Sequence, residues 1–151
     1  MPPTRDEVDA QLEELGARRL FEKVLSATDV RGGAVPGDRV VMPKRNTETH
    51  LPELESQAGV VLDVEDLEGQ RYRLRLTYWT NSPSSGRMYI LEGTSQLLQH
   101  YRLRTGDALV VARTGDGGLL MAGQRKQASR AGATCSRADC INKLGLALTL
   151  L

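Results

Sequence analysis

The stretch RYRLRLTYWTNSPSSGRM, residues 71–88, gives the clearest structural signal in this chain. In its first half basic and apolar side chains alternate, in the order Arg71, Tyr72, Arg73, Leu74, Arg75 and Leu76. Because successive side chains of a β-strand point to opposite faces, this spacing predicts a strand with one cationic and one apolar face. The small polar residues after Trp79 predict a loop that closes at Arg87.

Charge is unevenly distributed along the chain, although the net charge is only +1. Residues 71–87 contain no acid, whereas residues 53–68 contain six acids and no base, and residues 39–45 form a second basic group. This segregation allows one face of the molecule to be positive. A half-buried strand with a purely cationic outer face suits a surface that contacts an anionic polymer, and the alternative is an ordinary solvated strand face.

Length and composition indicate one domain with its own core. The chain has 151 residues, of which 40% are hydrophobic and 26% are charged. Cys135 and Cys140, with no histidine nearby, do not form a four-ligand zinc site, and we expect them to be free thiols. The polar N-terminus is no secretory signal, and the apolar segment 144–151 is too short to span a bilayer. We expect a soluble intracellular protein with no membrane partner.

Turn signals divide the middle of the chain into short strands with two brief helices. We expect strands at 20–25, 38–42, 59–66, 70–78, 87–92, 107–113 and 118–124. The brief helices are expected at 46–51 and 94–101, and a capping box formed by Thr4 and Glu7 predicts a lead-in helix at 4–15. Without a strand–long helix–strand rhythm, this order predicts a mainly β protein with a closed or nearly closed barrel.

No sequence motif of catalysis occurs in the chain. It lacks a nucleophile elbow, a P-loop, a dinucleotide-binding glycine motif and a zincin helix. The only histidines, His50 and His100, lie at a probable helix end and in an amphipathic helix, where a structural role is the usual one. We therefore expect no enzyme, no metal, no cofactor and no small-molecule substrate.

Several blocks of the chain, taken in order, resemble the plant-type B3 DNA-binding domain. They are LFEKVLSATD (20–29), RVVMPK (39–44), ETHLPELE (48–55), YWTNSPSSGRMYILEG (78–93), RLRTGDALVVAR (102–113) and GLLMAGQRK (118–126). The group that they resemble contains the Viviparous, Fusca and Leafy-cotyledon seed regulators. The resemblance implies a seven-stranded open pseudobarrel with two short helices over residues 20–126. Residues 1–19 would be a helical lead-in, and residues 127–151 a flexible tail.

In function, the resemblance implies sequence-specific binding of double-stranded DNA by a nuclear transcription regulator that is monomeric on DNA. Two loop arms, 26–38 and 79–88, would enter the major groove and recognise a CATGCA-like element. Asn81 and Arg87 would contact bases, whereas Arg31, Arg39 and Lys44 would contact phosphates. The full set of implied contact residues is Lys23, Ser26, Arg31, Arg39, Lys44, Arg75, Trp79, Asn81, Ser82, Ser85, Gly86, Arg87 and Met88.

The chain departs from the family pattern in both arms. The first arm is longer than the usual form and contains Pro36, and the second has extra residues between Trp79 and Arg87. These changes lie outside the expected core, so they affect the preferred DNA site and not the fold. Two alternatives stay open: a protein-interaction barrel, and the target-recognition module of a nuclease whose catalytic domain lies elsewhere.

Overall fold

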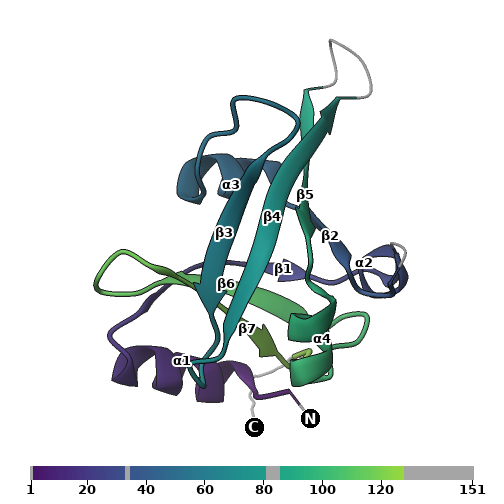
Figure 1. Ribbon diagram of the computed structural model, residues 1–151. Helices are drawn as coiled ribbons and strands as arrows, with labels where there is room; N and C mark the ends of the chain where they lie inside the picture. The colour runs from purple at the N-terminus through teal and green to yellow at the C-terminus, as the bar shows by residue number, and fades with distance from the viewer. Residues whose placement is uncertain (1, 33–34, 81–85, 128–151) are drawn as a thin grey trace, which may run out of the picture.

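A computed structural model describes residues 2–32, 35–80 and 86–127 of the chain (Figure 1). Within these ranges it contains seven strands and four helices. In chain order the elements are α1 (Arg5–Glu14), β1 (Arg18–Val24), α2 (Ala27–Arg31), β2 (Arg39–Met42), α3 (Lys44–His50), β3 (Val60–Glu65), β4 (Arg71–Thr80), β5 (Arg87–Glu92), α4 (Ser95–Tyr101), β6 (Ala108–Arg113) and β7 (Leu119–Gln124).

The seven strands form one strongly curled sheet in the order β1-β6-β7-β3-β4-β5-β2. Neighbouring strands are antiparallel except β3 and β7, whose short parallel contact pairs Val64 with Leu119 and Glu65 with Leu120. In Figure 1 the long strands β3, β4 and β5 stand upright, and β1, β6 and β7 cross beneath them. The edge strands β1 and β2 do not pair, so the barrel stays open. The predicted mainly β fold with seven strands is confirmed.

Alternation along β4 is as the sequence predicts. Tyr72, Leu74 and Leu76 are buried in the core, whereas the three arginines between and before them are exposed. The core is built mostly from leucine and valine, and its largest fully buried members come from five of the strands, from helices α1 and α4, and from the connecting residues Leu25 and Leu54. Burial of this apolar face stabilises the sheet by roughly 25 cal/mol for each Å² removed from water.

The outer face of β4 is not the purely cationic surface that we expected. Strand β3 lies beside β4 in a register that places Glu65 opposite Arg71 and Asp63 opposite Arg73. Each arginine Nε lies 3.3 Å from a carboxylate oxygen of its cross-strand neighbour. The prediction of a separate positive face is therefore wrong for this part of the sheet, because the acidic segment is the neighbouring strand.

The helices differ from expectation in one respect. Helix α2, within the predicted first arm, was expected to be loop, so the barrel carries three short helices and not two. Helix α1 forms the predicted capping box between Thr4 and Glu7, and its buried Val8 and Leu12 join the hydrophobic core. Residues 128–151, most of the predicted tail, lie outside the described residues. None of the helices in the described ranges has the length and apolar character needed to cross a membrane.

Two leucines of the N-terminal segment allow the contribution of α1 to be measured. Leu12 is 3% exposed, whereas Leu15, one turn further along, is 49% exposed. We predict that Leu12→Ala lowers the free energy of unfolding by about 2–4 kcal/mol, because it removes buried methyl groups and leaves a cavity. Urea unfolding followed by circular dichroism measures this change. Leu15→Ala is the matched control, and equal effects of the two substitutions would show that α1 does not pack as described.

Candidate nucleic-acid interface

Two segments project from the sheet at the side of its β2 edge (Figure 1). The second arm is the upper end of the β4–β5 hairpin, where residues 77–80 pair with residues 87–90. The first arm is the connection between β1 and β2, which contains α2 and a turn at 35–38. Strands β5 and β2 pair with each other between the two arms. The structure thus brings the two predicted arms to one side of the sheet.

The outer side of the second arm is apolar and exposed. Trp79 on β4 lies directly opposite Met88 on β5, and the two residues are 53% and 39% exposed. Further down the same face, Arg75 and Arg39 are both aligned with Glu92, from β4 and β2 respectively. The Arg75 guanidinium donates to the carbonyl oxygen of Ala58 at 2.8 Å. A large exposed aromatic side chain at the end of a hairpin is typical of a contact surface.

Arg87 lies on the inner side of the same arm. Its guanidinium carbon lies 4.0 Å from the centre of the Tyr78 ring, and its Nη1 donates to the carbonyl oxygen of Leu54 at 2.9 Å. Such a cation–π contact orients the guanidinium over the ring. Arg87 therefore links the base of the second arm to the segment between α3 and β3. Arg87 and Met88, which are neighbours in sequence, face opposite sides of the hairpin because strand side chains alternate.

Lys44 and Tyr89 complete the inner side of the second arm. A Cβ atom added to Gly86, whose φ is +74°, would lie only 2.6 Å from Lys44 Nζ, so the glycine leaves room for the ammonium group. The hydroxyl of Tyr89 donates to Glu48 Oε2 at 2.8 Å. Burial raises the pKa of Tyr89, and the hydroxyl therefore stays neutral at physiological pH. Two cations, Lys44 and Arg87, thus lie beside the inner backbone of this arm.

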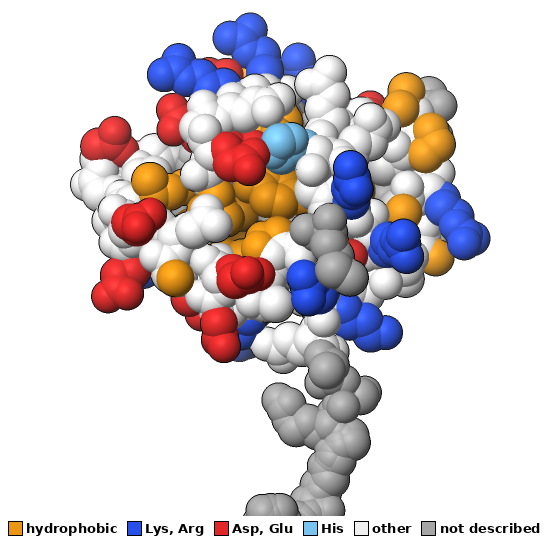
Figure 2. Space-filling view, turned by 90° about the horizontal axis from the view of Figure 1, so that it is seen from below, with side chains coloured by type: hydrophobic (Ala, Val, Ile, Leu, Met, Phe, Trp, Pro, Cys, Tyr) orange, Lys and Arg blue, Asp and Glu red, His pale blue; other side chains and the backbone are white. Residues whose placement is uncertain are grey.

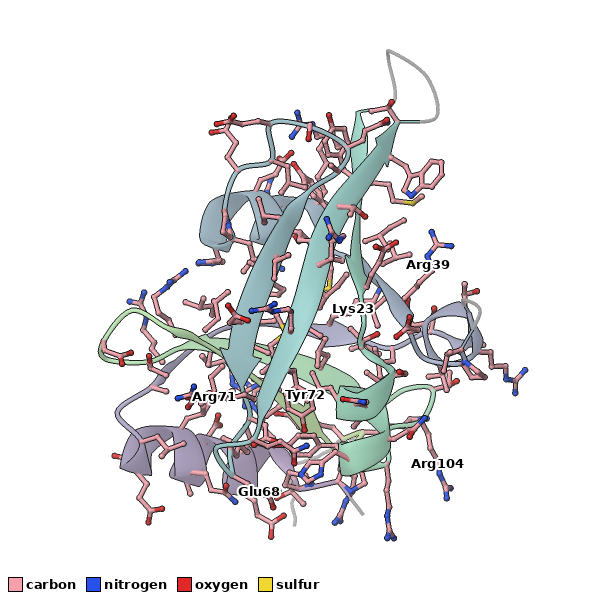
Figure 3. The ribbon with its side chains drawn as sticks, in the orientation of Figure 1. Lys23, Arg39, Glu68, Arg71, Tyr72 and Arg104 are labelled. Atoms are coloured by element: carbon pink, nitrogen blue, oxygen red, sulfur yellow. The ribbon has the colours of Figure 1, made fainter. Side chains whose placement is uncertain are left out.

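The first arm holds two of the predicted contact residues in internal contacts. Ser26 is the N-cap of α2, and its hydroxyl oxygen accepts a hydrogen bond from the Asp29 N–H at 3.2 Å. Lys23 Nζ lies 3.4 Å from Asp29 Oδ2. By contrast, Arg31 and Arg39 are exposed, and neither forms an ion pair with another residue that the structure describes. Figure 3 shows Arg39 projecting away from the sheet.

The structure thus divides the predicted contact residues into groups. Trp79, Met88, Arg75 and Arg39 lie on the outer side of strands β4, β5 and β2. Lys44, Gly86 and Arg87 lie on the inner side of the second arm. Asn81, Ser82 and Ser85 fall outside the described residues. Sequence reasoning missed Asp29 and Tyr78. The spacing Ser26-x-x-Asp29 is a capping pattern that would have indicated both α2 and the buried carboxylate.

The opposite end of the molecule contains a cluster with potential metal ligands. Among the described residues, Asp66, Glu68 and His100 place one ligand atom each within 4.8 Å of one another. However, Asp66 already accepts hydrogen bonds from the backbone N–H groups of Glu68 and Gln70 and from the hydroxyl of Tyr72. Burial, followed by the Asp66 hydrogen bond, raises the pKa of Tyr72. These contacts stabilise the β3–β4 turn, and we assign no metal or cofactor to them.

Charge at this end does not favour a polyanion. A hollow of about 380 Å³ is lined by Glu7, Glu68 and Arg125 together with His100 and Tyr101. Figure 2, which views the molecule from below, shows acidic side chains mainly on the left of this face and Lys and Arg side chains at its top and right. Helix α1, which lies there, contributes acids along its exposed face. The acids of α1 would repel phosphates on that side of this end, so the arms at the other end are the better candidate interface.

Comparisons with known proteins agree with this geometry. No family model matches the chain. The chain is similar to the B3 domain-containing transcription factor VAL3 of Arabidopsis thaliana, with 39% identity over 107 residues, 71% of this chain. It is also similar to the regulatory protein viviparous-1 of Zea mays, with 38% identity over 95 residues, 62% of this chain. These matches cover only 14% and 13% of the two relatives, whose names are those of regulators and not of enzymes.

Two solved structures are similar over nearly their whole length. The Arabidopsis FUS3–DNA complex has a TM-score of 0.65 and 30% identity, and the match covers 73% of this chain and 100% of that chain. The Arabidopsis thaliana LEC2–DNA complex has a TM-score of 0.63 and 29% identity, covering 74% of this chain and 96% of that chain. FUS3 is itself a B3 domain-containing transcription factor. The sequence blocks, the seven-stranded curled sheet and these similarities together show that the chain belongs to the B3 domain family.

Proposed function

We propose that the protein binds double-stranded DNA in a sequence-specific manner, as the DNA-binding domain of a nuclear transcription regulator. The observation that supports this most strongly is the pair of arms on one side of a fold whose relatives FUS3 and LEC2 were solved as DNA complexes. We further propose that the domain binds as a monomer and prefers a CATGCA-like element. The lengthened arms are the features that would alter this preference.

The second arm has the chemistry needed to contact bases. A two-stranded ribbon fits the major groove, where an asparagine amide can pair with adenine and an arginine with guanine. We assign base contacts to Asn81 and Arg87, with Ser82 and Ser85 as further polar groups of the same loop and Gly86 giving close approach of the backbone. Trp79 and Met88 would supply apolar contacts, for which the methyl group of thymine is the natural partner in this groove.

Exposure and existing partners determine which cations are suited to contact phosphates. Arg31, Arg39 and Lys44 are exposed, so they can approach the DNA backbone without breaking an internal ion pair. Lys23 is paired with Asp29, and Arg75 already donates to a carbonyl, so each would contribute less. Arg87 also donates to a carbonyl, that of Leu54, so its proposed base contact would use its remaining N–H groups. The Ser26 hydroxyl accepts a hydrogen bond within the arm and donates none to another described residue, so its proton stays available for a phosphate oxygen.

Selection of this domain against a random duplex library at moderate salt tests the proposal. Enrichment of a CATGCA-like core would support both the function and the proposed element. Enrichment of a different core would retain the function and reject the element. Salt-sensitive binding without enrichment would reject sequence specificity. Absence of binding would reject the function and favour the protein-interaction barrel, for which the exposed Trp79 and Met88 would be the contact surface.

Salt dependence distinguishes cations at the DNA from cations that are paired elsewhere. We predict that affinity falls by orders of magnitude between about 50 and 200 mM salt, because several phosphate contacts release counterions. Arg39→Ala should lower the slope of log affinity against log salt by about one unit. Arg73→Ala is the matched control, since Arg73 faces Asp63 on the outer face of the barrel. Equal slopes for Arg39→Ala and the unmodified domain would remove Arg39 from the interface.

Loss of a base contact should reduce discrimination between DNA sequences more than it reduces the stability of the folded domain. We predict that Asn81→Ala and Arg87→Ala each abolish the preference for the selected duplex over a scrambled one, at a cost of about 1–3 kcal/mol in specific binding. Fluorescence anisotropy with both duplexes measures the preference, and thermal unfolding checks the fold. Arg71→Ala, at the far end of β4, is the control. Unchanged discrimination in either variant would show that this residue does not contact bases.

A further inference from the structure

Asp29 is a buried carboxylate in an arm whose neighbouring residues are mostly exposed. Asp29 is 1% exposed. Its neighbours Ser26, Ala27, Thr28 and Arg31 are exposed. Removing an ionised carboxylate from water is costly unless the charge is paired and both oxygens accept hydrogen bonds. A buried acid at this position therefore needs a compensating role within the arm, and its partners show what that role is.

The carboxylate connects three segments of the chain. Oδ2 accepts a hydrogen bond from the Ser26 N–H at 2.9 Å and lies 3.4 Å from Nζ of Lys23 on β1. Oδ1 accepts a hydrogen bond from the N–H of Val41 on β2 at 3.0 Å. The Asp29 N–H completes the capping box by donating to the Ser26 hydroxyl. One side chain thus joins β1, α2 and β2.

The contact with Val41 satisfies an exposed sheet edge. Strand β2 is the last strand of the sheet and pairs only with β5. An edge strand has N–H groups with no neighbouring strand to accept them. Asp29 Oδ1 takes the place of that missing strand at Val41. The position of α2 against β2 is therefore defined by a directional, charge-assisted hydrogen bond.

Helix α2 cannot maintain its own orientation. It has five residues, far fewer than an isolated helix needs to be stable in water. The far end of the arm has two separate contacts. The Thr94 hydroxyl donates to the carbonyl oxygen of Gly37 at 2.5 Å. The Gly93 N–H donates to the carbonyl oxygen of Asp38 at 3.0 Å. Between its two ends, Asp29 makes the hydrogen bond that attaches the described part of the arm to β2, and Val30 beside it packs against the hydrophobic core without fixing a direction.

We propose that Asp29 is a positioning residue for DNA recognition, fixing the first arm against the edge of β2 so that Arg31 and Arg39 lie at defined places. The proposal rests on the proposed function, because it assigns to Asp29 the geometry of the arm that contacts DNA. Lys23 acts through the same carboxylate as its charge partner. Asp29 itself does not contact DNA, since it is buried beneath the arm and would repel phosphates.

The substitution Asp29→Asn tests this role, because an amide has one acceptor oxygen where the carboxylate has two. Either Ser26 or Val41 must then lose its partner. We expect exchange of the amide hydrogen that loses its acceptor, Val41 or Ser26, to become about tenfold faster or more when it is followed by NMR. Exchange in β6 and β7 should stay as in the unmodified domain. The ratio of affinities for selected and scrambled duplexes should fall about tenfold.

The direction of the change in DNA affinity distinguishes loss of arm positioning from a simple effect of net charge. Asp29→Asn makes the domain more positive, so an electrostatic effect alone would tighten binding to DNA. Asp6→Asn, on the exposed face of α1, is the matched control with the same charge change. We expect Asp29→Asn to bind the selected duplex more weakly than Asp6→Asn. If the variant unfolds the barrel, Ser26→Ala provides the second test, because it removes the hydroxyl cap of α2. Ser26 is also a proposed phosphate contact, whose loss would weaken binding to both duplexes alike, so the readouts are Val41 exchange and the ratio of affinities, with changes in the same direction but smaller.

Discrimination equal to that of the unmodified domain in Asp29→Asn would overturn the proposal, as would unchanged exchange at both Val41 and Ser26. A third outcome distinguishes this failure from failure of the proposed function. If the unmodified domain binds no duplex at all, the function itself is rejected and the role of Asp29 in DNA recognition is rejected with it. Faster Val41 exchange in that case would show a purely structural contact.

Discussion

The register of strand β4 is the constraint on which the rest of the structure depends. Its ten residues pair with β3 over residues 71–76 and with β5 over residues 75–80, so one strand is shared by the barrel and the second arm. The alternation that buries Leu74 and Leu76 also determines that Trp79 faces outward and Tyr78 inward. A slip of one residue would reverse every side chain, exposing the core and turning the arm over. The hydrophobic core therefore fixes the orientation of the proposed contact surface.

The two arms are attached to this barrel by different kinds of interaction. The second arm continues the ladder of β4 and β5, and Arg87 and Tyr89 add side-chain contacts to Leu54 and Glu48. The first arm has no ladder of its own, and it is attached by the packing of Val30 and by polar contacts, chiefly those of Asp29 and the hydrogen bond between Thr94 and Gly37. Strand pairing gives a stiff hairpin, whereas a few directional hydrogen bonds give an arm that single substitutions can loosen. Recognition of a groove by both arms would require both kinds of attachment.

Much of the fold could be predicted from the sequence, because period-two alternation and turn residues are local signals. All seven strands lie close to their predicted ranges, and the buried face of β4 is the predicted one. Pairing between strands is not local, so the sequence did not reveal that Asp63 and Glu65 would face Arg73 and Arg71. Helix α2 was missed because five residues give too short a periodic pattern, although its capping residues are visible. The sequence could also have predicted that Arg87 and Trp79 lie on opposite faces of the hairpin. Arg87 shares a strand face with Tyr89, which is buried, whereas Trp79 lies on the exposed face.

The central claim is that DNA lies against the two arms and not against the acidic end of the molecule. Titration of the ¹⁵N-labelled domain with its selected duplex, followed by amide chemical shifts, tests this most directly. The account predicts that shifts are concentrated in residues 26–32, 35–44 and 78–88, while α1 and the β3–β4 turn are little affected. Large shifts in α1 and around Glu68, with unaffected arms, would contradict it.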